Sequence, residues 1–239
     1  MSKFSQRSDQ KELLDGDDLP FEAIRVNMQE LDFINSWLGG HRITLAGIRS
    51  FLPAAAPTAF PLHICEIGCG GGDNLRVVKQ YLDQKKFPAV YTGIDLKPHC
   101  FTYASSRIEN HGITFVCSDY KNASFASKPH ILFSSLFCHH FTNEELLQQL
   151  QWMKEESTLG FFVNDLHRHP LAYYSIQWLT RCFSKSYLVK HDAPLSVLRG
   201  FQKDEFISLQ QAAVPGNAIL QWKWAFRWLL VYKHEPHTI

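Results

Sequence analysis

The sequence lacks several features that would place the protein in a specialised class. Its 24 Lys and Arg against 23 Asp and Glu leave a formal net charge of +1, which provides no broad basic surface for nucleic acid. The six cysteines form no C-x-x-C pair, and no run of about 18 uncharged apolar residues is present. The N-terminus is polar and has no apolar core of an export signal. We therefore expect a reduced, cytoplasmic protein without a membrane span and without a nucleic-acid partner.

The first 60 residues differ in pattern from the rest. Apolar residues recur at three- and four-residue steps from Phe21 to Leu38, which predicts a helix that ends at the glycines 39 and 40. A second short helix is expected over 42–51, followed by a linker in the proline-rich stretch 53–61. The acidic stretch 13–20 reads as a solvated loop. We expect residues 1–60 to form a helical cap on a main unit at 61–239.

From residue 61 onward, short apolar runs alternate with helical patterns, which is typical of a parallel sheet covered by helices on both faces. The end of the chain instead reads as two strands, 218–223 and 227–233, whose short connection predicts an antiparallel hairpin. An insertion at about 166–199, with a helix introduced by Pro170, would form a lid over the substrate. The expected parallel strands are 63–67, 90–95, 113–117, 130–135 and 160–165, with helices at 73–85, 98–110 and 143–155. The fold class is α/β, a Rossmann-like seven-stranded sheet.

Glycines follow the first expected strand in the stretch "ICEIGCGGGDNLRVV". A strand that ends in glycines and leads directly into a helix allows a ligand to approach the backbone closely. The dinucleotide pattern G-x-G-x-x-G fails here because its third position is Asp73. Glu66 and Asp73 disfavour a pyrophosphate and suit a cationic ligand with an amino group. The alternative is a tight turn without any ligand.

The loop Glu66-x-Gly68-x-Gly70-x-Gly72, followed by "YTGIDLKP", "VCSDY" and "FSSLFCHH", resembles the class I S-adenosylmethionine-dependent methyltransferases. In that family the acidic residue of the second strand grips the ribose, that of the third meets the adenine amino group, and the fourth strand ends near the sulfonium. "INSWLGGHR" and "HDAPLSVLRGF" extend the resemblance to a small-molecule branch related to ubiquinone and menaquinone biosynthesis methyltransferases. The resemblance implies contacts to S-adenosylmethionine, with S-adenosylhomocysteine as product, from Glu66, Gly68, Cys69, Gly70, Gly72, Asp73, Asp95, Leu96, Asp119, Tyr120, Ser135 and Leu136. Helix capping by Asp95 and a solvated turn at Asp119 are the competing interpretations.

Methyl transfer to a phenol needs a base, because a phenol with a pKa of about 10 is protonated at neutral pH. His139 and His140 follow the fourth expected strand, at the sheet edge where doubly wound folds bind ligands. We favour His140 as the base, with packing or capping as the alternative role for both histidines. Asp165 ends the fifth strand and could hold a histidine in the required tautomer or pair with Arg168. Neighbouring histidines rarely ligate one ion, so we expect no metal site.

Substrate contacts are expected from the rim and the insertion. The residues after the fifth strand and those of the expected lid offer polar groups and aromatic rings, and the N-terminal helix bearing Trp37 could form the opposite wall. The insertion helix carries an apolar stripe that includes Trp178 and would line the substrate pocket, although such a stripe more often belongs to a core. The candidates are His167, Arg168, Tyr173, Tyr174, His191, Arg199 and Trp37.

These features favour a methyltransferase that acts on oxygen, with carbon as second choice, of a hydrophobic phenolic, quinone-like or polyketide-derived molecule. A non-catalytic S-adenosylmethionine-binding module and a protein methyltransferase are the alternatives. A nicotinamide-dependent oxidoreductase is disfavoured by the missing third glycine and by the terminal hairpin. The oligomeric state stays open.

Overall fold

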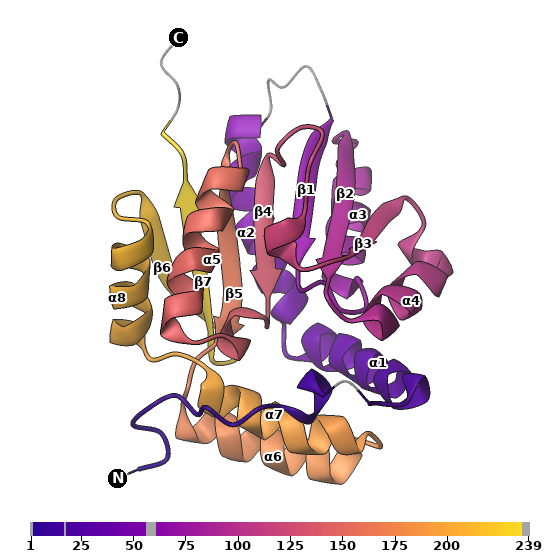
Figure 1. Cartoon of the computed structure of the whole chain (residues 1–239), viewed down its shortest axis with the longest axis vertical. Coiled ribbons are helices and arrows are strands. Elements are labelled where there is room, and N and C mark those ends of the chain that lie inside the picture. The colour runs from indigo at the N-terminus through magenta and orange to yellow at the C-terminus, as the bar shows by residue number, and fades with distance from the viewer. Residues whose placement is uncertain (1, 17, 56–60, 236–239) are drawn as a thin grey trace.

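A computed structural model describes residues 2–16, 18–55 and 61–235, and its centre is one seven-stranded sheet in the order β3-β2-β1-β4-β5-β7-β6 (Figure 1). β1 to β5 pair in parallel, whereas β7 runs antiparallel to both β5 and β6. The expected Rossmann-like sheet with a terminal hairpin is thereby confirmed. The strands are β1 Leu62–Ile67, β2 Ala89–Asp95, β3 Ile113–Cys117, β4 Ile131–Ser135, β5 Gly160–Leu166, β6 Ala218–Lys223 and β7 Arg227–Lys233.

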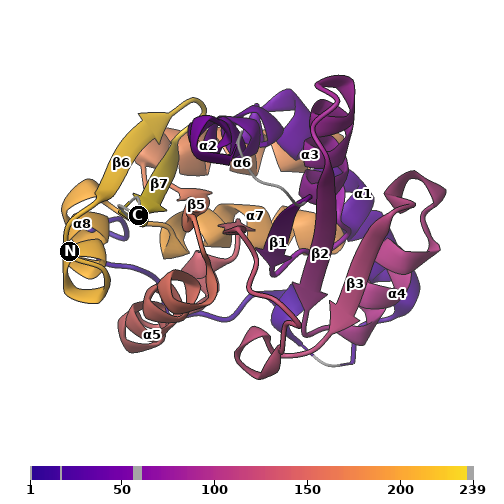
Figure 2. The ribbon, with the colours of Figure 1, turned by 90° about the horizontal axis from the view of Figure 1, so that it is seen from above.

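Alternating side chains of the strands feed two separate cores, one on each face of the sheet. Ile64 and Phe162 pack with α2 and α3, whereas Cys65 and Phe161 pack with α5 and α8. Figure 2 shows α2 and α3 on one side of the sheet and α5 on the other. The helices of these layers are α2 Gly40–Ala55, α3 Asp73–Gln84, α5 Asn143–Glu156 and α8 Lys203–Ala213.

The remaining helices lie beyond the carboxyl ends of the parallel strands (Figure 1). α1 (Phe21–Trp37) packs against α4 (Pro98–Ser106) through Met28 and Tyr103. The insertion forms two helices, α6 (Pro170–Phe183) and α7 (Tyr187–Arg199). The segment of residues 2–16, here called the N-terminal segment, lies along α7. Among the described residues no helix is long and apolar enough to cross a membrane.

The first 60 residues are tied closely to the sheet. α2 crosses β5 so closely that a Cβ on Gly47 would approach the ring of Phe162 to 2.5 Å. α2 also continues to Ala55, beyond the expected end at residue 51, and residues 56–60 of the expected linker lie outside the described part. The helical cap is therefore built into the same core as the sheet.

Several local expectations are wrong. The acidic stretch expected as a solvated loop contains a short 3-10 helix, Leu13–Asp15, because distant side chains bind its backbone. The insertion holds a second helix with Pro194 inside it, and the helix expected at 98–110 ends at Ser106. The apolar stripe of α6 is not core, since Trp178 is 61% exposed. α6 packs on α7 with its other face, which leaves this stripe at the surface.

Candidate active site

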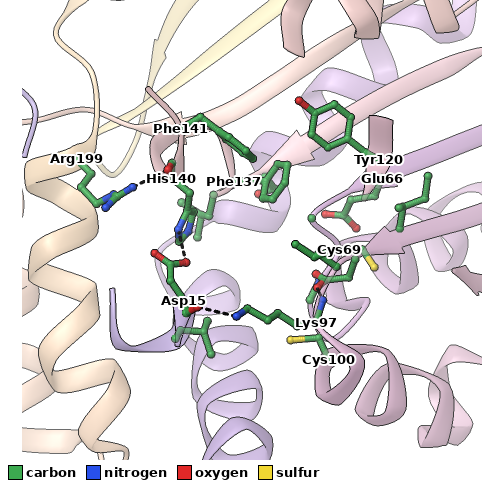
Figure 3. Close-up of a pocket in the computed structure, with 18 of the residues that line it drawn as sticks. Asp15, Glu66, Cys69, Lys97, Cys100, Tyr120, Phe137, His140, Phe141 and Arg199 are labelled. Carbon is green, nitrogen blue, oxygen red and sulfur yellow. Dashed lines mark hydrogen bonds and ion pairs between the residues drawn. The ribbon is translucent and has the colours of Figure 1, made fainter. Parts of the chain in front are cut away.

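A cavity of about 880 Å³ opens at the carboxyl ends of the parallel strands. Its floor comes from the loops after β1, β2 and β4, and its other walls come from α1 and the N-terminal segment. Figure 3 shows Arg199, His140, Asp15 and Lys97 joined in series along one border, with Glu66 and Tyr120 across the cavity. The position agrees with the general rule that ligands bind doubly wound sheets at this edge.

The glycine loop after β1 uses left-handed backbone conformations at three positions. Gly68, Gly70 and Gly72 have φ of 65°, 49° and 74°, which other residues adopt only at a cost. A Cβ on Gly68 would lie 2.2 Å from the ring of Phe137, and one on Gly72 would lie 2.6 Å from Phe115. On Gly70 it would meet only a methionine sulfur, at 3.3 Å. Packing therefore demands two of these glycines, and Gly70 is the position with bare backbone beside the cavity.

Asp95 ends β2 beside this loop, and the backbone fixes both of its carboxylate oxygens. Oδ2 accepts a hydrogen bond from the Gly70 amide at 2.8 Å, and Oδ1 accepts one from the Lys97 amide at 2.9 Å. Burial raises the pKa of Asp95, although these bonds and the Lys97 charge oppose it. The Lys97 ammonium in turn donates to the carbonyl of Asp15 at 2.7 Å. The carboxylate of Asp95 is thus preoriented at the cavity wall.

Glu66 and Asp73 both line the cavity, but they have different surroundings. Asp73 accepts a hydrogen bond from His41 at 2.8 Å, and this partner helps to hold the pKa of Asp73 low despite burial. Glu66 Oε1 accepts a bond from Asn74 at 3.1 Å, whereas Oε2 has no partner among the described residues. Burial, and then the Asp73 charge, raise the pKa of Glu66 well above its ordinary value. A buried carboxyl group with an unpaired oxygen fits a ligand that carries a positive charge or donates a proton.

The other residues expected at the cofactor also lie at this cavity. Asp119 caps a short 3-10 helix by accepting a bond from the Lys121 amide at 3.0 Å, and Tyr120 packs its ring against Trp152. The Leu136 amide donates to the carbonyl of Asn164 at 2.9 Å. The cavity lining includes Cys69, Leu96, Asp119, Tyr120, Ser135 and Leu136.

His139 is buried behind the cavity between two carboxylates. Its Nδ1 lies 2.8 Å from Asp165 Oδ1, and its Nε2 lies 3.4 Å from Glu12 Oε1. Burial alone would lower the pKa of His139, but Asp165 and Glu12 outweigh it and raise the pKa to about 9. The imidazole is therefore cationic at neutral pH and turned away from the cavity, which it does not line.

His140 faces the cavity. Its Nδ1 lies 3.1 Å from Asp15 Oδ1, and its Nε2 is 3.9 Å from Glu12 Oε2. Arg199 holds the backbone beneath both histidines, because it donates to the carbonyl of His139 at 3.0 Å and to that of His140 at 2.7 Å. Of the two neighbouring histidines, His140 is thus the one that can meet a substrate.

The structure does not bring most of the expected substrate contacts to this cavity. Arg168 is fully buried and donates to the carbonyls of Phe4 and Gly200 and to Glu205, so that it ties β5 to the end of the insertion. The structure therefore supports neither a substrate contact by Arg168 nor the expected pairing with Asp165. Arg199 does line the cavity.

The aromatic and imidazole candidates have other partners. His167 accepts a bond from the Trp222 indole at 3.2 Å, and burial, followed by the nearby His169 and Arg168, lowers the pKa of His167 to about 4. His191 pairs with Asp192 at 2.7 Å. Tyr173, Tyr174 and Trp37 also lie outside the cavity lining: the tyrosines pack on Phe4, and Trp37 packs on Phe33.

The main omission of the sequence analysis is the N-terminal segment. Arg7, Lys11 and Asp15 line the cavity, together with Met28 and Asn35 of α1. No strand end or helical period marks Arg7, Lys11 and Asp15 in the sequence. Their only signal is the pairing of acidic and apolar residues in "ELLD", directly before the first helix.

Two carboxylate–imidazole groups among the described residues have ligand atoms within 4.8 Å of one another: Glu12, His139 and His140 in one, Asp32, His41 and Asp73 in the other. The members of each group already have partners among other side chains of the protein. In the first group, Nδ1 of His139 faces Asp165 and Nδ1 of His140 faces Asp15. In the second, Arg76 pairs with Asp32 at 2.6 Å. The carboxylates of both groups thus pair with arginine or histidine side chains. The absence of a metal stays a prediction.

Comparisons with known proteins found one family model and several solved structures that resemble this chain. Residues 64–156, from β1 to the end of α5, match a family model described as a methyltransferase domain. No curated protein matches the chain. The plantazolicin methyltransferase BpumL, solved with a pentazolic desmethylPZN analog and SAH, superposes with a TM-score of 0.61 at 16% identity and covers 90% of this chain and 97% of its own. BamL, a second plantazolicin methyltransferase solved with a triazolic analog and SAH, gives 0.55 at 18% identity, with coverage of 84% and 77%.

At these identities the two solved structures establish the fold, and the family model identifies the segment that carries the glycine loop, Asp95 and Asp119. That segment also supplies His139 and His140. Residues 64–156 therefore match a methyltransferase domain, and the chain as a whole has the Rossmann-like fold of methyltransferases that were solved with SAH.

Proposed function

We propose that the protein transfers the methyl group of S-adenosylmethionine to a hydroxyl oxygen of a hydrophobic small molecule, and that His140 takes the proton of that hydroxyl. One observation carries the proposal: the glycine loop, Asp95 and the imidazole of His140 line the same cavity, and Asp15 faces that imidazole with its carboxylate. An arrangement that binds S-adenosylmethionine without using it would not need a paired imidazole at the same cavity.

The residues present fit the cofactor. Asp95 offers a fixed carboxylate for ribose hydroxyls, and Asp119 and Tyr120 stand where the resemblance places the adenine. Glu66, with its unpaired oxygen, and Gly70, with its bare backbone, suit the amino-acid portion of the molecule. When bound, S-adenosylmethionine supplies an electrophilic methyl group on a positively charged sulfur. The protein's part is to hold the donor and the acceptor in line, and such orientation can contribute about 7 to 11 kcal/mol.

His140 would act on the acceptor. With Nδ1 donating to Asp15, the neutral imidazole keeps the lone pair on Nε2 as its basic site. A positioned base of this kind contributes roughly 10² to 10⁴ in rate. His139 and Asp165, buried directly behind, would hold the loop that carries His140.

A hydrophobic acceptor is supported by the rings of Phe137, Phe141 and Tyr120 at the cavity. BpumL and BamL were solved with a pentazolic and a triazolic desmethylPZN analog, which agrees with a small-molecule acceptor for this chain. The narrower relation to ubiquinone and menaquinone biosynthesis methyltransferases belongs to this proposal and rests on the sequence resemblance alone. The alternative within this proposal is transfer of the methyl group to a carbon atom of the acceptor.

The test uses three acceptors of similar shape: 1-naphthol, 1-naphthylamine and 1-naphthoic acid. Formation of S-adenosylhomocysteine is followed by mass spectrometry, and binding of the cofactor is measured separately by calorimetry. We expect binding of S-adenosylmethionine and turnover with the naphthol, lost in His140→Gln and retained in His111→Gln, which changes an exposed histidine outside the cavity lining. Turnover with the amine or the acid alone would contradict oxygen transfer to a hydroxyl. Equal turnover in His140→Gln would contradict the assignment of the base.

A further inference from the structure

Asp15 is held in place by contacts from three separate parts of the fold. Asp192 of α7 accepts hydrogen bonds from the amides of Leu13 and Leu14 at 2.8 and 2.9 Å, which pins the 3-10 helix that ends at Asp15. The Asp15 carbonyl accepts a bond from the Lys97 ammonium at 2.7 Å. Oδ2 of Asp15 accepts a bond from the Glu12 amide at 3.2 Å. One carboxylate oxygen, Oδ1, is left to face His140.

Besides its contacts with α7, the N-terminal segment contacts the loop that carries the histidines. Arg7 donates to the carbonyls of His139 and Phe141 at 3.1 and 2.9 Å. Glu12 reaches His139 and also accepts a bond from Ser196 at 2.6 Å. The segment therefore contacts His139 and His140 through side chains of three of its residues, Arg7, Glu12 and Asp15.

Glu12 and Asp15 face the two histidines in different surroundings. The pair of Glu12 and His139 is buried, and neither residue lines the cavity. Asp15 and His140 both line it. Burial raises the pKa of Asp15, but its bond to His140, followed by the Glu12 amide and Arg199, lowers the pKa below its ordinary value, so Asp15 is an anion at neutral pH. An anion on Nδ1 fixes that nitrogen as the protonated one and directs the Nε2 lone pair elsewhere.

We propose that Asp15 is the positioning residue of His140, and that the N-terminal segment, through Asp15, is part of the active site. This inference rests on the proposed function of His140 as the base. It implies that the catalytic pair is assembled from two parts of the chain that are far apart in sequence, since His140 follows β4 and Asp15 precedes α1. The bond of Lys97 to the Asp15 carbonyl also joins this pair to the loop that fixes Asp95, and so to the cofactor wall.

The decisive variant is Asp15→Asn, which keeps the shape of the side chain and removes its charge. Asp18→Asn is the matched control, because Asp18 follows the same segment, is exposed and does not line the cavity. We expect kcat with 1-naphthol to fall roughly 10- to 100-fold in Asp15→Asn, within the range for a general base that loses its orientation, and to stay unchanged in Asp18→Asn. KM and the affinity for S-adenosylmethionine should stay within about twofold, because the residue binds neither molecule in this account. Asp15→Glu should recover part of the loss.

A spectroscopic measurement separates positioning from general support of the fold. Two-bond ¹H–¹⁵N correlation spectra of ¹⁵N-histidine-labelled protein report the tautomer of each ring, with His140→Gln to assign the signal. We expect the Nδ1–H tautomer of neutral His140 in the wild type and in Asp18→Asn, and a loss of that preference in Asp15→Asn. Asp15→Ala serves the same measurement if Asp15→Asn does not fold.

The outcomes distinguish the two proposals. If His140→Gln loses turnover while Asp15→Asn retains both the rate and the tautomer, the role of Asp15 is refuted and the proposed function stands. If the wild type binds S-adenosylmethionine but methylates none of the three naphthalenes, the acceptor class fails, and the tautomer alone decides the role of Asp15. Activity that is lost in EDTA and restored by Zn²⁺ or Mn²⁺ would make the histidines metal ligands and overturn the inference.

Discussion

The buried contact of His139 with Asp165 and Glu12 should make the stability of the protein depend on pH in a defined direction. The pKa of His139 is about 9 in the folded protein against an ordinary 6.5 in the unfolded chain. A raised histidine pKa means that the folded state holds the proton more tightly. The stabilisation is fully present below pH 6.5, declines between 6.5 and 9, and is absent above 9.

The size of the effect follows from the same two values. From 6.5 to about 9, at about 1.4 kcal/mol for each pH unit, the proton contributes about 3 kcal/mol to the free energy of unfolding. Burial raises the pKa of Asp165, but the charge of His139 outweighs burial and lowers it, and the pKa of Glu12 is lowered in a similar way. These carboxylate shifts describe the same contacts from the other side, so they are not added to the histidine value.

The assay is urea unfolding followed by tryptophan fluorescence at about pH 6 and about pH 9.5, with His139→Gln as the reference. Cysteines and tyrosines also titrate across this range, and the reference variant removes their shared contribution. We expect the wild type to exceed His139→Gln by about 3 kcal/mol more at the lower pH than at the higher. Equal differences at the two pH values would show that His139 is held neutral and would refute the ion-paired description.

Three further predictions address the glycine loop, the cofactor wall and a residue expected at the substrate. Gly68→Ala should lose more stability in thermal melts than Gly39→Ala, because both have positive φ but only the first places a Cβ against a ring, at 2.2 Å; overpacking adds about 1 to 3 kcal/mol, and equal losses would contradict the clash. Asp95→Asn should weaken S-adenosylmethionine and S-adenosylhomocysteine by about 10- to 100-fold in calorimetry, and an unchanged affinity would remove Asp95 from the cofactor site. Arg168→Met should cost about 1 to 3 kcal/mol in urea unfolding, because it removes the donor of the buried Gly200 carbonyl, while KM for 1-naphthol stays the same; a raised KM in a stable variant would return Arg168 to the substrate.

The sheet could be predicted because its signals are local. Strands buried on both faces read as short apolar runs, and the glycine loop marks the junction of β1 and α3. The family resemblance implied Asp95 and Asp119 at the cofactor, and both line the cavity at the edge where the ends of the parallel strands meet. The cavity lining contains every residue that the sequence assigned to the cofactor except Gly72, whose own position is fixed by Phe115.

The rest of the site depends on contacts between distant parts of the chain. Asp15 is 125 residues from its partner His140, and Arg168 is 164 residues from the Phe4 carbonyl that it binds. A charged side chain in a segment without periodicity gives no indication of the partner it will find. The interpretation of the apolar stripe of α6 was wrong for a related reason. A period of 3.6 identifies an apolar face, but it does not say whether another element covers that face.

The two adjacent histidines show what the tertiary structure adds to a motif. In the sequence, "CHH" offers two side chains of identical chemistry at the end of one strand, and nothing local separates them. The 3-10 helix Cys138–His140 turns one ring into the core and the other to the cavity. The ring in the core lies between two carboxylates and keeps its proton, so it has no basic nitrogen to offer at neutral pH. The ring at the cavity has one nitrogen opposite a carboxylate and its second nitrogen beyond hydrogen-bond distance of Glu12. The neighbouring carboxylates and the direction of each ring, and not residue type, therefore separate the two histidines, and in the proposed reaction only His140 is placed to take a proton from an acceptor.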